Sequence, residues 1–124
     1  DPVLEAPAPE PSAAYKSVVR NGAVEDGKGN WVYAWKEQEM FTEYTDDNGD
    51  VQTVAAQKTA YDTANTAALA ATERAKRTAL LMETDHYALA DVTMTDAMKT
   101  YRQALRDVPQ QTDFPSKIDW PTKP

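Results

Sequence analysis

The fold is decided by residues 54–83, which read VAAQKTAYDTANTAALAATERAKRTALLME and contain neither glycine nor proline. Alanine dominates, with Gln, Lys, Glu and Arg between, and this composition has the highest intrinsic helix propensity. Small and apolar residues recur every three or four positions and share one face: Tyr61, Ala64, Ala68, Ala71, Ala75 and Met82. Such a narrow stripe buries little apolar area and allows close backbone approach. We therefore predict a long helix that lies against another helix, from the same chain or from a neighbour.

A second, shorter helix is predicted after Met94. Thr95 is a favourable N-cap residue, and Asp96 places negative charge in the first turn, where the helix dipole favours it. Its apolar stripe consists of Ala97, Met98, Tyr101, Leu105 and Val108. Pro109 ends the helix, because proline lacks the N–H donor that helix continuation requires.

The residues after Pro109 are too apolar for a free linker. Phe114, Ile118 and Trp120 lie among prolines in residues 110–124. We predict that this segment forms a strap that packs back onto the domain or onto a partner.

Residues 15–53 carry signals of β-structure. Trp31 to Trp35 is an aromatic, β-favouring run in which Trp31, Tyr33 and Trp35 alternate onto one face. Asn21-Gly22 and residues 26–30 precede it and are turn-forming. A further strand is predicted at 40–45, pairing with 51–54 across a type I′ Asn48-Gly49 turn. These features predict a small antiparallel sheet of two to four strands.

Residues 1–14 hold prolines at positions 2, 7, 9 and 11, interleaved with Ala and Glu. Each proline fixes φ and pushes the preceding residue toward extended geometry, which indicates a semi-extended arm. Two interpretations remain open, a disordered tail and a strap that docks on a partner.

The predicted fold class is therefore α+β. It comprises an N-terminal antiparallel hairpin or sheet, a long Ala-rich helix, a short second helix and a Pro/aromatic C-terminal strap. The predicted organisation is a Pro-rich arm at 1–14, a β region at 15–53 and a helical hairpin with its strap at 54–124.

Composition excludes several classes of partner. The chain has 124 residues and a net charge of -7, whereas nucleic-acid binding requires clustered Lys and Arg to displace counterions from phosphate. The same charge disfavours an anionic membrane surface, and no apolar run approaches the roughly 18 residues needed to span a bilayer. We predict neither nucleic acid nor membrane as a partner.

No catalytic, cofactor or metal site is predicted. The chain has no cysteine, and His86 is its single histidine, without a visible nucleophile beside it. Asp46 to Asp50 resembles a calcium loop only superficially, because Gln57 occupies the twelfth position, where a bidentate Glu is required. The glycines of residues 26–30 lack the spacing of a phosphate loop. The chain is therefore predicted to act by binding rather than by catalysis, and a hydrolase using His86 is a distant alternative.

The last third of the chain carries an ordered series of short motifs. They are Arg77-Thr-Ala-Leu80-Leu81, Thr84-Asp85, Leu89-Ala-Asp91, Tyr101-Arg-Gln-Ala-Leu-Arg-Asp-Val-Pro109, Phe114-Pro115 and Trp120-Pro121 with Pro124. Over residues 73–124 the chain resembles the phage tail assembly chaperone family, and it is similar to the C-terminal region of tail fibre assembly proteins. His86 and Met98 stand where that family commonly has Trp.

The resemblance implies a phage tail assembly protein that acts through protein–protein contacts. Its implied partner is a tail or tail fibre protein, in the host cytoplasm during assembly, with a homo-oligomer as a further association. The alternative is a permanent structural or adaptor subunit of the virion tail. Sequence alone does not separate the two.

Within this region Tyr101 and Leu105 are expected to face the preceding helix around Leu80 and Leu81. Arg102 and Arg106, four residues apart, share a helix face and could pair with Asp85, Asp91 or a partner's carboxylates. The candidate partner-binding residues of the whole chain are Trp31, Trp35, Ala68, Ala71, Arg102, Gln103, Arg106 and Trp120.

Overall fold

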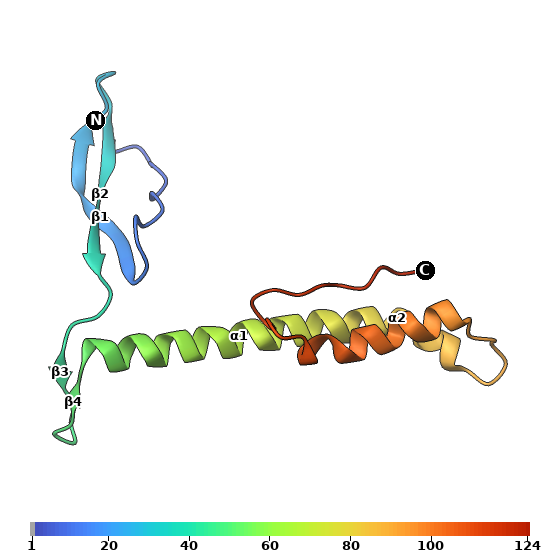
Figure 1. Ribbon diagram of the computed structural model, residues 1–124. Helices are drawn as coiled ribbons and strands as arrows, with labels where there is room; N and C mark the ends of the chain where they lie inside the picture. The colour runs from blue at the N-terminus through green and yellow to red at the C-terminus, as the bar shows by residue number, and fades with distance from the viewer. Residues whose placement is uncertain (1) are drawn as a thin grey trace. The chain divides into compact units, whose positions relative to one another are not determined.

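The computed structural model describes residues 2–124 and confirms the α+β class (Figure 1). The chain forms two compact units, one ending at Ala60 and one running from Tyr61 to Pro124. The first unit holds the strands, and the second holds most of the helical structure. Asp1, the first residue of the predicted arm, lies outside the described residues.

The first unit is built on an antiparallel hairpin of β1 (Lys16–Glu25) and β2 (Trp31–Glu39). Lys16 lies opposite Glu39 at the open end, and Glu25 lies opposite Trp31 beside the turn. The strand predicted from the aromatic run at Trp31 is therefore confirmed, and it extends to Glu39.

Asn21-Gly22 was expected to form a turn, and that expectation is wrong. The pair lies inside β1, where the register with β2 shifts between Arg20 and Ala23. Gly22 has a φ of 75°, the left-handed backbone that a bulge residue needs and that glycine adopts without steric cost. A glycine with positive φ occurs both in hairpin turns and in bulges of this kind, so the dipeptide alone does not distinguish them.

A second small hairpin pairs β3 (Tyr44–Thr45) with β4 (Val51–Gln52). The predicted pairing across Asn48-Gly49 is confirmed, but the strands are shorter than expected and the turn is not type I′. Only Gly49 has a positive φ, at 89°, whereas a type I′ turn needs positive φ at both central residues. Gly49 N–H donates to the Asp46 carbonyl at 3.0 Å, and Asp46 N–H donates to the Asp50 carbonyl at 2.9 Å. The turn is therefore a wider one, in which Gly49 alone has the left-handed backbone conformation.

The carboxylate of Asp46 explains why the wider turn forms. It accepts the backbone N–H groups of Asn48 and Asp50, each at 3.0 Å, and Nε2 of Gln52 at 2.9 Å. An aspartate at the start of a turn supplies the acceptor that the turn's own backbone lacks. These bonds require a loop that wraps around the carboxylate, which a two-residue turn does not provide.

The β1–β2 turn uses the same chemistry. The Asp26 carboxylate accepts the backbone N–H of Lys28 at 2.8 Å and both the backbone and side-chain N–H of Asn30 at 3.1 Å. Gly29, three residues after Asp26, has a φ of 86°. The turn predicted at residues 26–30 is confirmed.

The long helix α1 runs from Val54 to Met82, one residue short of the predicted end at Glu83. Thr53 precedes it, and its Oγ1 accepts the N–H of Ala56 at 3.1 Å, which satisfies one of the donors left over at a helix start. Only Ala70 is buried among the residues of α1, and every residue from 59 to 69 is exposed.

The second helix, α2, runs from Asp96 to Asp107. Its predicted cap is confirmed, because Thr95 Oγ1 accepts the N–H of Met98 at 3.2 Å. A 3₁₀ turn, η1 (Asp85–Ala88), precedes it, and another, η2 (Val108–Gln110), contains Pro109 and follows it. Pro109 therefore stands just beyond the α-helix, as expected.

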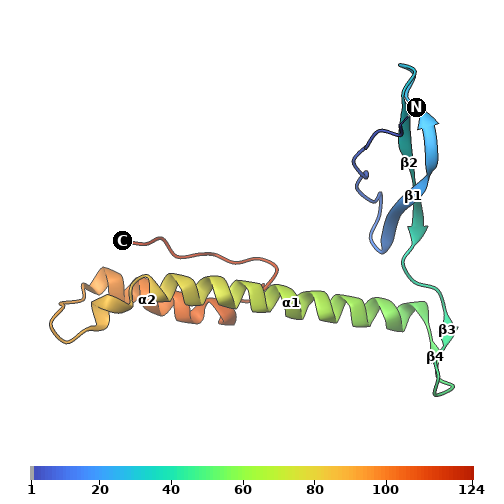
Figure 2. The same ribbon diagram turned by 180° about the vertical axis from the view of Figure 1, so that it is seen from behind.

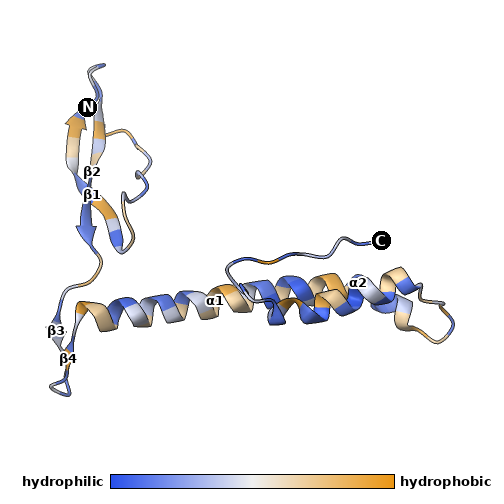
Figure 3. Cartoon of the chain, in the orientation of Figure 1, coloured by the Kyte–Doolittle hydropathy of each residue, from blue (hydrophilic) through white to orange (hydrophobic). Residues whose placement is uncertain are grey.

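The core of the second unit lies between α1 and α2, which run side by side (Figures 1 and 2). Leu105 and Val108 are 0% exposed. Met98, Tyr101 and Leu105 form the buried cluster, and the partly buried residues packed on it are Leu80, Leu81, Tyr87, Met94 and Trp120. Figure 3 shows apolar positions on both helices along this contact. The predicted packing of Tyr101 and Leu105 around Leu80 and Leu81 is confirmed.

Hydrogen bonds to Asp46, first from the Asp50 N–H and then from the Gln52 side chain, hold its pKa below the usual value of an aspartate. Because the folded pKa is lowered, the carboxylate stabilises the hairpin above the pKa of the unfolded chain. This contribution is lost as the pH falls through the folded pKa. In an NMR titration we expect the Asp46 carboxyl midpoint to lie below that of an unstructured aspartate.

Two single variants give matched controls for this titration. Gln52→Ala removes one donor and should raise the Asp46 midpoint while leaving Asp26 unchanged. Asn30→Ala should raise the Asp26 midpoint, which is lowered by its own donors, and leave Asp46 unchanged. If Gln52→Ala left the titration midpoint of Asp46 unchanged, the hydrogen bond from Gln52 would not be a cause of the lowered pKa of Asp46.

Candidate partner-binding site

The guanidinium of Arg102 joins the two helices of the second unit. Arg102 is only 6% exposed. Its Nη1 donates to the Leu81 carbonyl at 2.9 Å and to Thr84 Oγ1 at 2.6 Å, and its Nη2 donates to Asp85 Oδ1 at 2.9 Å. Of the carboxylates considered for Arg102 and Arg106, which were Asp85, Asp91 and those of a partner, Asp85 is the one that pairs with Arg102.

The position of Arg102 follows from the chemistry of a helix end. The last carbonyls of a helix have no intrahelical partner, and they form the negative end of its dipole, which favours a cation. Leu81 lies in the last turn of α1, and its carbonyl also accepts the hydroxyl of Thr84 at 3.1 Å. Thr84 is 0% exposed, so its hydroxyl needs these partners to offset the loss of water. Arg102 thus completes the hydrogen bonding of the α1 terminus from α2.

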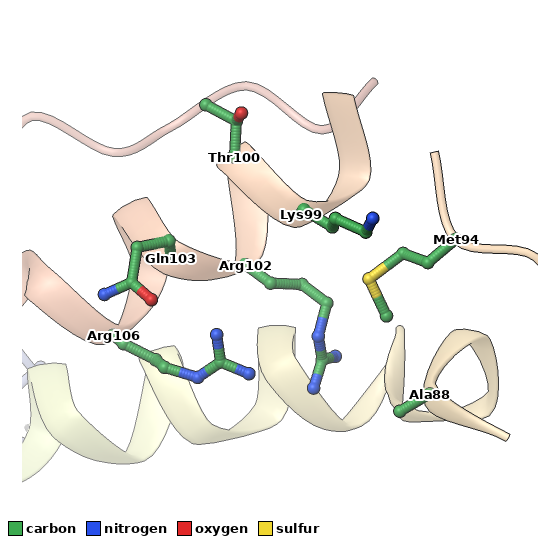
Figure 4. Close-up of a pocket in the computed structure, with 7 residues that line it drawn as sticks. All are labelled: Ala88, Met94, Lys99, Thr100, Arg102, Gln103 and Arg106. Atoms are coloured by element: carbon green, nitrogen blue, oxygen red, sulfur yellow. The ribbon is translucent and has the colours of Figure 1, made fainter. Parts of the chain in front are cut away.

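An open pocket of about 400 Å³ lies beside Arg102 (Figure 4). Side chains of α2 form most of it, and Ala88 of η1 and Met94, which precedes α2, supply the rest. Its lining residues are Ala88, Met94, Lys99, Thr100, Arg102, Gln103 and Arg106. Three of these residues are cationic and none is acidic, which makes the pocket a candidate binding site for an anionic group.

The polar side chains of the pocket differ in how far they are already engaged. Gln103 Nε2 donates to Asp107 Oδ1 at 3.0 Å, and Lys99 Nζ lies 3.7 Å from Asp96 in an exposed pair. No hydrogen bond or ion pair joins the guanidinium of Arg106 to another residue within 2–124. Figure 4 shows Arg106 extending from α2 next to Arg102. Arg106 is thus the cation of the pocket that has donors to spare.

Three of the predicted contact residues, Arg102, Gln103 and Arg106, meet in this pocket. The prediction missed Lys99, whose side chain lies on the same helix face, four positions before Gln103 and seven before Arg106. It also missed Met94 and Ala88, which come from the preceding segment and carry no local signal of a pocket.

Trp120 lies elsewhere in the second unit. It is partly buried against the core cluster, and Lys76 Nζ lies 4.3 Å from the centre of its ring. The strap that carries it is folded back as predicted. Gln111 holds the backbone of Asp119 by two hydrogen bonds, and Lys123 Nζ lies 3.6 Å from Glu83. The strap therefore runs along α1 in the second unit (Figure 2).

Ala68 and Ala71 are exposed and do not line the pocket. An α-helix turns by about 100° per residue, which places Ala68 on the side of α1 opposite the buried Ala70 and places Ala71 about a quarter turn from Ala70. Both residues of the predicted small-residue stripe therefore lie off the face of α1 that carries Ala70.

Trp31 and Trp35 belong to the first unit. Trp31 is 46% exposed, and Trp35 is partly buried. Arg20 lies over the aromatic face of β2, with its Cζ 3.9 Å from the ring centre of Tyr33 and 5.8 Å from that of Trp35. A cation over an aromatic ring is attracted by the negative ring face. Trp35 is therefore engaged within the hairpin, and Trp31 presents the larger accessible surface.

The Pro-rich arm pairs with this same hairpin. Leu4 N–H donates to the Trp31 carbonyl at 2.7 Å, and Tyr33 N–H donates to the Leu4 carbonyl at 3.3 Å. Glu5 forms an ion pair with Arg20 at 3.2 Å. The arm thus contacts its own chain beside β2, a partner that sequence reasoning had not considered.

Among residues 2–124 no three His, Asp or Glu side chains come together in a way that could hold a metal ion. His86 lies in η1, where its ring contacts that of Tyr87 at 4.1 Å between centres. None of the described helices is long and apolar enough to cross a bilayer.

The two arginines of α2 provide a matched test of this geometry. Arg102→Met keeps an unbranched apolar stem but removes three hydrogen bonds from a charged donor, and we expect unfolding to become easier by about 2 kcal/mol. Arg106→Met removes the same charge from an exposed position and should change stability by less than about 0.5 kcal/mol. Urea denaturation followed by circular dichroism measures both. Equal losses would show that the buried bonds of Arg102 do not stabilise the unit.

Comparison with known proteins places this unit in a family context. Neither the curated proteins nor the solved structures yielded a match to the chain. A protein-family model does match, and it covers residues 70–124, nearly all of the second unit. The resemblance predicted for residues 73–124 is thereby confirmed: residues 70–124 match the family described as phage tail assembly chaperone protein.

Proposed function

We propose that this protein acts in phage tail assembly as a chaperone that binds a tail or tail fibre protein. The observation that carries the proposal is that the family match lies within a single compact unit. The family match begins at residue 70 and ends at residue 124, and the compact unit that contains α2 and its pocket spans 61–124. The region that resembles the chaperone family is therefore the region that forms its own core.

The chemistry of the second unit favours binding over catalysis. Its buried polar groups, Arg102 and Thr84, are engaged in holding α1 to α2. Its exposed polar groups, Gln103 and Arg106, line an open pocket rather than an enclosed one in which reacting groups converge. Exposed donors of this kind suit recognition of another protein's surface.

A permanent subunit of the virion tail is the second candidate. The exposure of every residue from 59 to 69 on α1 favours it, because a helix that buries so little of itself is stabilised chiefly by neighbours. The chaperone would act in the host cytoplasm and leave before the particle is complete, whereas the subunit would remain in the virion tail.

Co-expression of the tagged protein with each tail protein of its phage tests the proposal. We expect one tail or tail fibre protein to co-purify with it. The major capsid protein of the same phage serves as the control and should not co-purify. Mass spectrometry of finished particles then separates the two candidates. Recovery of this protein from the particles in fixed proportion to the tail proteins would favour the permanent subunit. Failure of every tail protein to co-purify would contradict both.

We also propose that the exposed stripe of α1 associates with a second copy or with a partner helix. Ala68→Glu with Ala71→Glu places charge where small side chains allow close approach, and it should reduce the mass measured by light scattering or the amount of bound tail protein. The control is Thr63→Glu with Thr66→Glu, which adds the same charge to exposed positions on the opposite face. Equal effects of the two double variants, or no effect of either, would contradict association through the stripe.

A further inference from the structure

The pocket on α2 carries a charge opposite to that of the whole chain. The chain has 20 acidic and 13 basic residues, yet the pocket is lined by three cations and no acid. Ala88 and Met94 add apolar surface at one end. A cationic patch with an apolar end, on an acidic protein, is complementary to a ligand that combines carboxylates with an apolar side chain.

Two of the three cations remain able to bind a ligand. Arg102 is committed to Leu81, Thr84 and Asp85. Lys99 has only the exposed pair with Asp96, and exposed pairs of this kind contribute little and exchange readily. Arg106 has no ion pair within the described chain, and its planar guanidinium can hold a carboxylate by two parallel hydrogen bonds.

The backbone positions of Lys99 and Arg106 are held at a fixed spacing by helix α2. Lys99 and Arg106 are seven residues apart on α2, which at about 1.5 Å per residue places their backbones about 10 Å apart. The Thr95 cap, the buried Leu105 and the Arg102 bonds fix the helix that carries them. Binding groups fixed before the ligand arrives lose less entropy on binding.

We propose that this pocket binds an acidic segment of a partner polypeptide. In this arrangement one carboxylate meets Arg106, a second meets Lys99 about 10 Å away, and an apolar side chain lies against Met94. An extended segment rises about 3.3 Å per residue, so acidic residues three positions apart fit this spacing. The proposal rests on the proposed function, because it identifies the chemistry by which a tail protein is recognised.

A nucleic acid is the less favoured anionic ligand. Binding to a phosphate backbone depends on many cations spread along an extended surface, whereas this pocket offers only Arg106 and the weakly paired Lys99. The net charge of -7 opposes a polyanion further. An acidic peptide needs only the local pair of cations and also uses the apolar end of the pocket.

The test uses the full chain and a short peptide with blocked ends, in which two glutamates flank two leucines. In NMR spectra we expect the peptide to shift the amides of Lys99, Gln103 and Arg106, whereas the same peptide with glutamines leaves them unchanged. Arg106→Ala should weaken binding by about tenfold, the usual effect of losing a hydrogen bond to a charged group. Raising the salt concentration should weaken it as well.

Lys117→Ala is the matched control, because it removes one exposed cation from the same unit outside the pocket. It should leave the affinity for the peptide unchanged, and Arg106→Lys should restore part of the affinity lost in Arg106→Ala. Circular dichroism checks that each variant keeps its helical content. Equal shifts with the glutamate and glutamine peptides would overturn the proposal. So would equal losses in Arg106→Ala and Lys117→Ala, or tighter binding of a DNA oligonucleotide to the same amides.

Failure of this proposal is separable from failure of the proposed function. A tail protein that co-purifies equally well with wild type and with Arg106→Ala would remove the pocket as its binding site while leaving the assembly role intact. Peptide binding at the pocket, together with no co-purification of any tail protein, would support the pocket and contradict the assembly role.

Discussion

The second unit depends on one guanidinium. Arg102 reaches from α2 to the Leu81 carbonyl at the end of α1 and to Thr84 and Asp85 just beyond it. Burial of a cation is costly unless its donors are satisfied, and here a helix terminus, a hydroxyl and a carboxylate satisfy them together. Asp85 remains largely exposed, so only one member of the ion pair loses its water. The arrangement therefore fixes the angle and register of the two helices at a modest cost of desolvation.

The pocket follows from the same constraint. Arg102 separates the buried face of α2, which carries Leu105, from the exposed face, which carries Lys99 and Arg106. Because Arg102 cannot rotate away without losing its partners, the exposed cations keep a fixed position relative to Met94. The apolar core alone would permit sliding between two short stripes of similar shape, whereas directional hydrogen bonds to a helix end do not.

Sequence reasoning succeeded where the signal is local. The cap at Thr95, the end of α2 before Pro109 and the start of α1 at Val54 each depend on residues within a few positions of one another. It also found the packing of Leu105 near Leu80, because periodicity identifies apolar faces. It did not find the Leu81 carbonyl as a partner of Arg102, because every residue has a backbone carbonyl and the residue type does not indicate which one is bound. Nor did it assemble the pocket, whose walls come from separate segments.

The first unit shows how one local signal can support two structures. Asn-Gly occurs at 21–22 and at 48–49, and in the structure the first forms a bulge and the second closes a turn.

The difference lies in the residues that precede each Asn-Gly pair. Asp46 supplies a carboxylate that gathers the N–H groups of the second loop, as Asp26 does in its own turn. No aspartate precedes Asn21 at that distance, and the flanking residues continue the strand. An Asn-Gly pair thus becomes a turn here where an acceptor three residues before the glycine organises the loop, and it remains a bulge where that acceptor is missing.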